Sequence, residues 1–335
     1  MTLDRVMTGT PLTIAEARKI VTSMMEGVFS REETAAILSI LAYRGETAEE
    51  ISGFAQGMLD KASSMSFPYD VLDTCGTGGD GSGTYNVSTA SAILLSSMGV
   101  KVAKHGNRSV SSKTGSADVL EELRIPFQGN VKEAEQRLED YSLTFFFAPV
   151  YHMAMKNVAP VRKALKQKTI FNILGPLTNP ARAPRRVIGA YSLDAARKMA
   201  HASLHLPIER ALFVTGEDGL DEFTVQGASY VIELQDNELR EYTINPEDVG
   251  LKRSSLHGAL VNNAAESAAL IRDIFRKKAS REAVDLLLLN AGAALYTSGV
   301  AETIKDGVEM ADHALGEPVL AHLEKLQLEE GAEML

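Results

Sequence analysis

The chain has no tryptophan and a single cysteine, Cys75, among its 335 residues. One cysteine excludes an intrachain disulfide and a multi-cysteine zinc site, and it favours a reducing compartment, so we expect a cytoplasmic protein. The apolar runs fall well short of the roughly 18 residues that a membrane span needs, and the start of the chain has no basic segment followed by an apolar one. We therefore expect neither membrane insertion nor secretion.

Basic residues are fewer than acidic ones, and the formal net charge is −10. The chain thus lacks the general basic field that supplies affinity for nucleic acids, and we expect no nucleic-acid partner. Hydrophobic residues make up 45% of the chain and charged residues 23%. This is the composition of a globular protein, and the length suffices for one large domain and a smaller one.

Residues 1–65 are predicted to form a small helical domain. The capping box S/T-x-x-E, which satisfies free N–H groups at a helix start, occurs at Thr13, at Ser30 and at Thr47. Gly27 and Gly45 are placed to end the first two of these helices. Residues 63–68 are the predicted linker.

From residue 71 onward, predicted strands and helices alternate, which favours a mostly parallel sheet flanked by helices. This large α/β domain is predicted over residues 70–335, and a helix over residues 151–166 is expected to join the small domain. The stretch 171–180 is expected to be irregular, and the last third to be helical. The strands are predicted at 71–74, 100–103, 143–147, 186–191, 211–215, 229–234 and 239–244, and the main helices at 88–98, 116–123, 264–276, 280–296 and 300–315.

Two glycine- and hydroxyl-rich loops, residues 73–89 and 104–118, each follow a predicted strand and lead into a helix. Exposed N–H groups at glycine turns and helix starts bind anions, and ligands of such sheets bind at the carboxyl ends of strands. The second loop adds the cations Lys104, Arg108 and Lys113, although on its own it would fit a solvated basic loop equally well. Together the loops predict a phosphate-bearing substrate.

The first loop fits three other kinds of structure less well. Gly76 to Gly81 matches G-x-G-x-x-G, but the helix begins too late, near Ser88, and no acidic residue follows about 20 positions on, which argues against a dinucleotide site. The chain has no Gly-Lys pair, which excludes an ATP P-loop. A plain turn would not need four glycines around Asp80.

An acidic pair, Asp221 and Glu222, follows the strand predicted at 211–215. Adjacent carboxylates usually lie in solvent, but they also bind Mg²⁺, which typically takes one or two protein carboxylates together with substrate phosphates. Beside a polyphosphate site, a Mg²⁺ bridge is the favoured interpretation. Cys75 is interpreted as a packing residue and not as a nucleophile.

Long motifs along the whole chain resemble those of the anthranilate phosphoribosyltransferases. These are the helical opening, the Gly-Thr-Gly-Gly-Asp run at 76–80, Asn-Val-Ser-Thr at 86–89, Lys-His-Gly-Asn-Arg at 104–108, residues 111–121, residues 169–180 and the acidic pair. The resemblance implies a helical domain hinged to a large nucleoside phosphorylase-like α/β domain, a homodimer through the helical part, and transfer of a phosphoribosyl group to anthranilate in tryptophan biosynthesis.

The resemblance also implies roles for individual residues. Mg²⁺ would be bound by Ser88, Asp221 and Glu222, and anthranilate by Gly76, Asn107 and Arg162, with His105 and His152 as orienting groups and no strong general acid or base. Without the resemblance, Arg162 would be interpreted as a solvated helix residue. The residues matched to phosphoribosyl pyrophosphate contacts are Gly76, Gly79, Asp80, Thr84, Asn86, Val87, Ser88, Thr89, Lys104, His105, Gly106, Asn107, Arg108, Ser109, Val110, Ser111, Ser112 and Ser116.

The chain departs from the family pattern at Met153, at Arg124 and at residues 166–168, and none of these changes removes a matched contact. Two alternatives are kept: a pyrimidine-nucleoside phosphorylase of similar architecture, and a transferase-like relative that binds nucleic acid. The second should have lost the glycine loop or gained a basic surface, and this chain has done neither.

Overall fold

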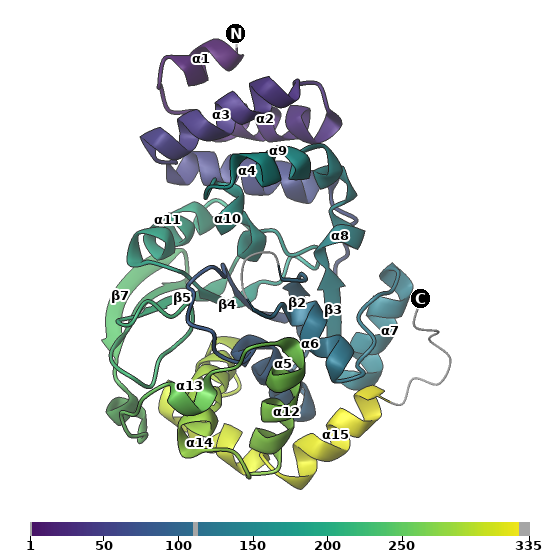
Figure 1. The fold of residues 1–335 in the computed structure, drawn as a ribbon, viewed down its shortest axis with the longest axis vertical. Coiled ribbons are helices and arrows are strands. Elements are labelled where there is room, and N and C mark those ends of the chain that lie inside the picture. Colours follow the sequence, from purple (N-terminus) through teal and green to yellow (C-terminus); the bar gives the residue numbers. More distant parts are fainter. Residues whose placement is uncertain (1, 110–112, 328–335) are drawn as a thin grey trace.

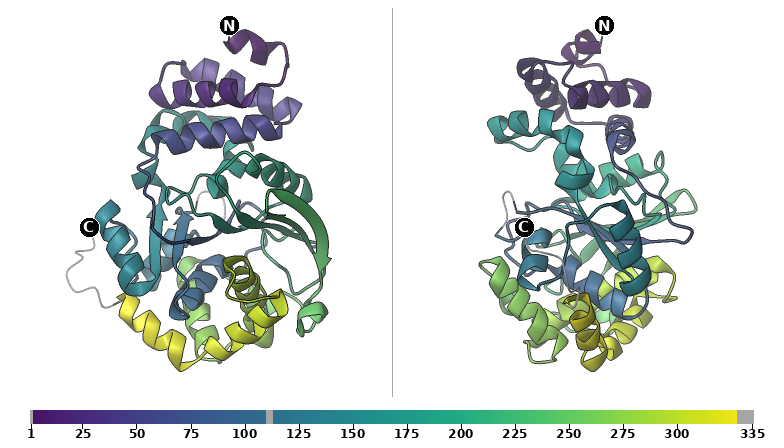
Figure 2. Two further views of the ribbon diagram at one scale, coloured as in Figure 1. Left: turned by 180° about the vertical axis from the view of Figure 1, so that it is seen from behind. Right: turned by 90° about the vertical axis from the view of Figure 1, so that its right-hand side faces the viewer.

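The computed structural model describes residues 2–109 and 113–327. A helical bundle lies at one end of the molecule and helices α12 to α15 at the other, with a twisted sheet between them (Figures 1 and 2). The helices are α1 (Thr2–Met7), α2 (Ile14–Glu26), α3 (Arg31–Arg44), α4 (Ala48–Lys61), α5 (Val87–Ser97), α6 (Ser116–Glu122), α7 (Val131–Tyr141), α8 (Ala148–Tyr151), α9 (Ala159–Leu165), α10 (Phe171–Leu174), α11 (Leu193–Ser203), α12 (Ala264–Phe275), α13 (Arg281–Ser298), α14 (Ile304–Ala314) and α15 (Glu317–Gln327).

The sheet has the strand order β3-β2-β1-β4-β5-β6-β7. The first five strands in this order are parallel to one another, whereas β6 is antiparallel to both β5 and β7. This mostly parallel sheet with an N-terminal helical domain confirms the predicted fold class. The strands are β1 (Leu72–Gly76), β2 (Val102–Gly106), β3 (Leu143–Phe147), β4 (Arg185–Gly189), β5 (Arg210–Gly216), β6 (Ser229–Gln235) and β7 (Glu238–Ile244).

Alternate strand residues point to opposite sides of the sheet, and in the central strands both sets are buried. In β5, Leu212 and Val214 join the core formed with α5 and α12 to α15. Ala211 and Phe213 join a second core that continues into the helical bundle through α11. One apolar core therefore runs from the sheet into the N-terminal helices.

All three predicted capping boxes are present, at Thr13, Ser30 and Thr47, and Gly27 and Gly45 end α2 and α3. The helices α2 and α4 pack closely because Gly53 has no side chain: a Cβ there would lie 2.3 Å from the carbonyl oxygen of Ile14.

The helix predicted over residues 151–166 is interrupted. After α8, His152 leaves the helical region (φ −113°, ψ 49°), a 3₁₀ turn covers Met153–Asn157, and α9 begins at Ala159. Pro160 in the first turn of α9 explains this start, since its missing N–H has no helical acceptor there. The 3₁₀ turn contacts α2, and α9 contacts α3.

Other differences are smaller. The strands β1 and β2 run two or three residues further than predicted, so Gly76 and Gly106 end strands. The stretch predicted to be irregular contains α10 and a 3₁₀ turn at Gly175–Leu177. The helices α7, α11 and α15 were not predicted. Within the described residues, no helix is both long enough and apolar enough to span a bilayer.

Candidate active site at the carboxyl ends of the strands

The predicted site residues on the loops lie where β1, β2, β3 and β5 end, at the edge of the sheet that faces the helical bundle, whereas Arg162 belongs to α9 in the helical part (Figure 1). The glycine loop, residues 77–86, follows β1. The basic loop follows β2, and three of its predicted contacts, Val110, Ser111 and Ser112, lie outside the described residues. The acid loop, residues 217–228, follows β5.

The acid loop crosses the ends of β1 and β4 in direct contact with them. Oδ2 of Asp221 accepts a 2.6 Å hydrogen bond from the N–H of Gly78. A Cβ on Gly76 would lie 2.6 Å from the same oxygen, and a Cβ on Gly189 would lie 1.6 Å from the carbonyl oxygen of Asp221. Glycine at both strand ends therefore permits the acidic pair to reach the glycine loop.

The carboxylates are electrostatically crowded. Burial, together with the nearby Asp80 and Glu222, raises the pKa of Asp221 well above its usual value. Burial also raises the pKa of Glu222 to about 7, although Lys104 and hydrogen bonding from Ser88 favour its ionised form. The raised pKa values mean that the protein alone does not fully stabilise the ionised carboxylates. A bound cation would stabilise that form.

No group of three His, Cys, Asp or Glu side chains in the described part of the chain is arranged to hold a metal ion. Asp221, Glu222 and the Ser88 hydroxyl are hard oxygen donors of the kind that Mg²⁺ prefers. A Mg²⁺ ion held by two carboxylates would complete its coordination with water and substrate oxygens. The donor set thus fits Mg²⁺ bound together with a phosphorylated ligand.

Lys104 lies beneath the loops, with only 2% of its surface exposed. Its Nζ donates to the carbonyl oxygen of Thr74 and, at 3.2 Å, to Oγ of Ser88. The side chains of Val87, Thr89 and His105 are buried as well. These four residues support the site from below, so that a ligand above would meet their backbone groups.

The basic loop, residues 107–115, is held by helix α6 and by the segment just before α12. Arg108 is paired with Asp118 and Glu121 at 2.9 and 2.7 Å, and it covers the ring of Phe127. Lys113 donates to the carbonyl oxygen of Val261 and to Oδ1 of Asn262. Both cations therefore have protein partners in this state.

The structure places His105 and His152 side by side, with ring centroids 5.3 Å apart. Nδ1 of His105 donates to the carbonyl oxygen of Gly175, and Nε2 of His152 donates to that of Thr178. The other ring nitrogen of each is buried without a partner among the described residues, and it carries a lone pair because the proton is on the bonded nitrogen. Burial lowers the pKa of His105 to about 4 and that of His152 to about 3, so both rings are neutral near pH 7.

Arg162 extends from α9 over the ring of Phe171, with its guanidinium carbon 5.2 Å from the ring centre. It is partly buried, which lowers its pKa, and it makes no ion pair with a described residue. A half-buried guanidinium without a counter-ion is suited to a ligand carboxylate. Asn107 is exposed at the end of β2, where its Oδ1 accepts from the N–H of Arg108.

Several supporting residues were missed by the sequence analysis because their contacts are long-range. Buried Asp73 accepts from the N–H of His105 and from Nδ2 of Asn179. The hydroxyl of Thr77 accepts from the N–H of Tyr191 and fixes the glycine loop to the end of β4. A charged residue inside the predicted strand 71–74 was the only available signal for Asp73. Cys75 is partly buried, and burial raises the pKa of its thiol to about 12, in line with a packing role.

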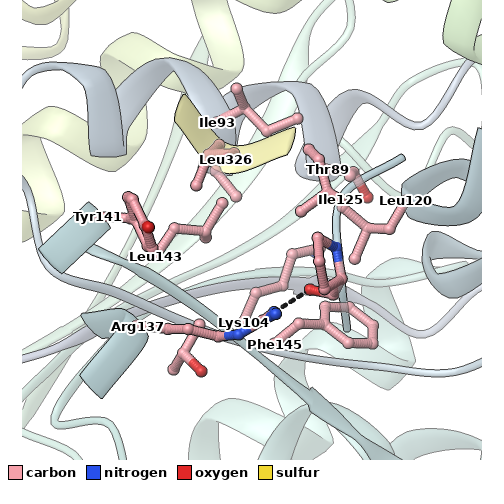
Figure 3. A pocket seen from close by; sticks show the side chains of 13 residues that line it. Thr89, Ile93, Lys104, Leu120, Ile125, Arg137, Tyr141, Leu143, Phe145 and Leu326 are labelled. Carbon is pink, nitrogen blue, oxygen red and sulfur yellow. Dashed lines mark hydrogen bonds between the residues drawn. The ribbon is translucent and has the colours of Figure 1, made fainter. Parts of the chain in front are cut away.

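A separate cavity of about 20 Å³ lies behind the site between α5, α6, α7, β3 and α15 (Figure 3). Its walls are mostly apolar side chains such as Ile93 and Leu326, and Arg137 closes one side by donating to the carbonyl oxygen of Pro126. A space of this size holds about one water molecule. It is too small for a substrate.

Comparison with known proteins gives matches over both parts of the chain. Residues 2–62 match the model "Glycosyl transferase family, helical bundle domain", and residues 68–317 match "Glycosyl transferase family, a/b domain". The anthranilate phosphoribosyltransferase of Geobacillus thermodenitrificans is 47% identical over 329 residues, which cover 98% of this chain and 97% of the relative. That of Bacillus subtilis is 46% identical over 323 residues, or 96% of each chain.

Solved structures are similar as well. The anthranilate phosphoribosyltransferase of Thermus thermophilus superposes with a TM-score of 0.92 at 37% identity, covering 97% of this chain and 98% of that one. The Saccharomyces cerevisiae enzyme in complex with phosphoribosyl pyrophosphate and Mg superposes with a TM-score of 0.83 at 26% identity, covering 93% and 91%.

Proposed function

The chain belongs to the anthranilate phosphoribosyltransferase family, and from this premise we propose how its own residues bind and align the two substrates. The enzyme transfers the phosphoribosyl group of 5-phosphoribosyl 1-pyrophosphate to the amine of anthranilate and releases pyrophosphate, a step of tryptophan biosynthesis. The observation that carries the proposal is the contact of Asp221 with the glycine loop, which brings a pair of metal-binding carboxylates to an anion-binding turn.

The phosphoribosyl pyrophosphate site is assigned to the ends of β1 and β2. Backbone N–H groups of the glycine loop and of the α5 start would bind pyrophosphate oxygens, because they are donors at a helix N-terminus. The exposed cation Arg108 would exchange its carboxylate partners for the ligand. We assign the same set of contacts as the family resemblance implies, with Val87, Thr89, Lys104 and His105 acting through backbone atoms or from beneath.

Mg²⁺ is assigned to Ser88, Asp221 and Glu222. When bound, the ion supplies positive charge to the departing pyrophosphate. The protein's part is to keep two carboxylates at the strand ends, where Gly76 and Gly189 leave room for them. The structures of yeast relatives with Mg support this assignment.

The acceptor site is assigned to Gly76, Asn107 and Arg162, with His105 and His152 beside them. Arg162 would pair with the anthranilate carboxylate. The two histidines are buried, and so are their free ring nitrogens, so they would orient the acceptor by supporting the residues in front of them and not by direct contact with the amine. The amine is already neutral, and the reaction therefore needs alignment more than a strong base. Orientation of reactants can lower a barrier by roughly 7–11 kcal/mol in favourable cases.

The domain division, the association of two copies and the cellular location are also part of the proposal. The chain divides into a helical domain, residues 1–65 with the segment 151–166, and an α/β domain, residues 70–335. We propose that the two domains close over the substrates. Two copies associate through the helical domain, where Tyr43 is 95% exposed on α3. The enzyme acts in the cytoplasm, as the single cysteine and the absence of a membrane-spanning helix among the described residues suggest.

The function is tested by following anthranilate fluorescence, which a chain without tryptophan does not obscure. Addition of phosphoribosyl pyrophosphate and Mg²⁺ should abolish the anthranilate signal, and chelation of Mg²⁺ should stop the loss. A second reaction with inorganic phosphate and a pyrimidine nucleoside tests the phosphorylase alternative. Turnover in the second reaction only would overturn the assignment.

A further inference from the structure

Ser267 lies on α12 and is completely buried, yet it contacts the predicted substrate residue Asn86 twice. Its Oγ accepts a 3.0 Å hydrogen bond from the backbone N–H of Asn86 and donates a 2.9 Å hydrogen bond to Oδ1 of the same residue. The two residues are 181 positions apart in the chain. A paired contact of this kind fixes both the backbone and the side chain of Asn86.

The amide oxygen of Asn86 has a second donor, the hydroxyl of Thr114, at 2.5 Å. Oδ1 therefore faces the two hydroxyls, and Nδ2 points away from them. Nδ2 donates to no described residue, and Asn86 is partly exposed. The donor edge of the amide is therefore available to a ligand.

Asn86 precedes α5 at the N-cap position, where asparagine usually accepts from an N–H of the first turn. Here it makes no such cap bond. The Asn86 side chain does not cap α5, and its amide oxygen is instead bound by Ser267 and Thr114.

We infer that Ser267 is a positioning residue for 5-phosphoribosyl 1-pyrophosphate: by holding the amide oxygen of Asn86, it presents Nδ2 as a hydrogen-bond donor to the substrate's phosphate oxygens. The inference rests on the proposed substrate contact of Asn86. It adds α12, an element without a predicted site residue, to the machinery that binds this substrate.

Ser267→Ala removes both contacts and lets the Asn86 amide rotate. We expect KM for phosphoribosyl pyrophosphate to rise about threefold to tenfold, the range that one or two neutral hydrogen bonds support. KM for anthranilate and kcat should change little. Ser203→Ala is the matched control, because Ser203 is also buried on a helix but donates only within α11.

Ser267→Cys keeps the size of the side chain and is the second variant if Ser267→Ala fails to fold. Its thiol is a weak donor, so KM for phosphoribosyl pyrophosphate should still rise. A fall in Tm with both KM values unchanged would overturn the inference and leave Ser267 with a structural role alone.

Asn86→Asp separates the inference from the proposed contact. Its carboxylate can still accept from Ser267 and Thr114, but it replaces the Nδ2 donor by a negative oxygen, so KM for phosphoribosyl pyrophosphate should rise by more than tenfold. If Asn86→Asp has no effect, the contact itself is wrong. If Asn86→Asp weakens binding and neither Ser267 variant does, only the role of Ser267 is refuted.

Discussion

The N–H of Gly78 donates a 2.6 Å hydrogen bond to Oδ2 of Asp221, which joins two loops that are 143 residues apart in the chain. Gly78 adopts φ +66°, a conformation that residues with side chains rarely take. The position of the acidic pair is therefore tied to a turn that glycine makes possible. A ligand that binds the glycine loop meets the carboxylates at the same place.

The acidic pair is expected to set the Mg²⁺ requirement. Asp221→Asn combined with Glu222→Gln should raise the Mg²⁺ concentration for half-maximal activity by at least about tenfold, because neutral amides are poorer ligands for a hard cation. A Mg²⁺ titration of initial rates measures this. Asp236→Asn, in the exposed β6–β7 turn, is the control. An unchanged titration would reject the metal assignment.

Arg162→Ala should raise KM for anthranilate about tenfold or more and leave KM for phosphoribosyl pyrophosphate nearly unchanged. The reason is that a half-buried guanidinium without a protein counter-ion is free to pair with the acceptor's carboxylate. Lys163→Ala, at the exposed neighbouring position, should leave both constants as they are. Steady-state kinetics with each substrate varied gives the answer, and the reverse pattern would refute the role.

The ion pairs of Arg108 are expected to compete with substrate. Glu121→Gln should lower KM for phosphoribosyl pyrophosphate by up to about threefold, since an exposed ion pair contributes roughly 0–1 kcal/mol. The effect should fade at high salt, where such pairs are screened. Glu122→Gln is the control, because no ion pair joins Glu122 to a described residue. A rise in KM instead would mean that Glu121 holds Arg108 in its binding position.

The buried histidines predict a loss of stability in mild acid. The pKa of His152 is lowered to about 3 in the folded enzyme, whereas an unfolded histidine titrates near 6.5, so the unfolded state binds the extra proton between these values. The neutral ring makes its full contribution to the free energy of unfolding above pH 6.5. Below pH 6.5 that contribution decreases, by about 1 kcal/mol at pH 5.5. Thermal unfolding at pH 7.5 and 5.5 should show a smaller pH dependence for His152→Gln than for the parent enzyme. Equal pH dependence would contradict the assignment.

The exposed aromatic Tyr43 is expected to lie in the contact between two copies. Tyr43→Glu should shift the enzyme from dimer to monomer in light scattering after gel filtration, because a charge would be buried against an apolar partner surface. Val300→Glu, at an exposed position in the loop between α13 and α14, should leave the mass unchanged. A monomeric parent enzyme would remove the basis of this prediction.

Local patterns were enough for much of the fold. Capping boxes depend on residues three positions apart, and for this reason the starts of α2, α3 and α4 could be predicted from sequence. β3 was predicted with its observed bounds because residues 143–147 form a short run that is mostly aromatic and apolar. The break at His152 was missed, since the apolar spacing of residues 151–166 continues through it and only the packing on α2 and α3 separates the turn from α9.

The amino-acid sequence by itself determined the kinds of groups at the site: glycines that permit positive φ, two adjacent carboxylates, and an arginine suited to a carboxylate. These depend on residue type and short spacing. The tertiary structure decided which atoms face a ligand. It placed Lys104 beneath the loops, fixed the lone pairs of His105 and His152 through two backbone carbonyls, and brought Ser267 to Asn86. Such contacts join residues far apart in the chain, and only the packing of the strands and helices brings them within hydrogen-bond distance.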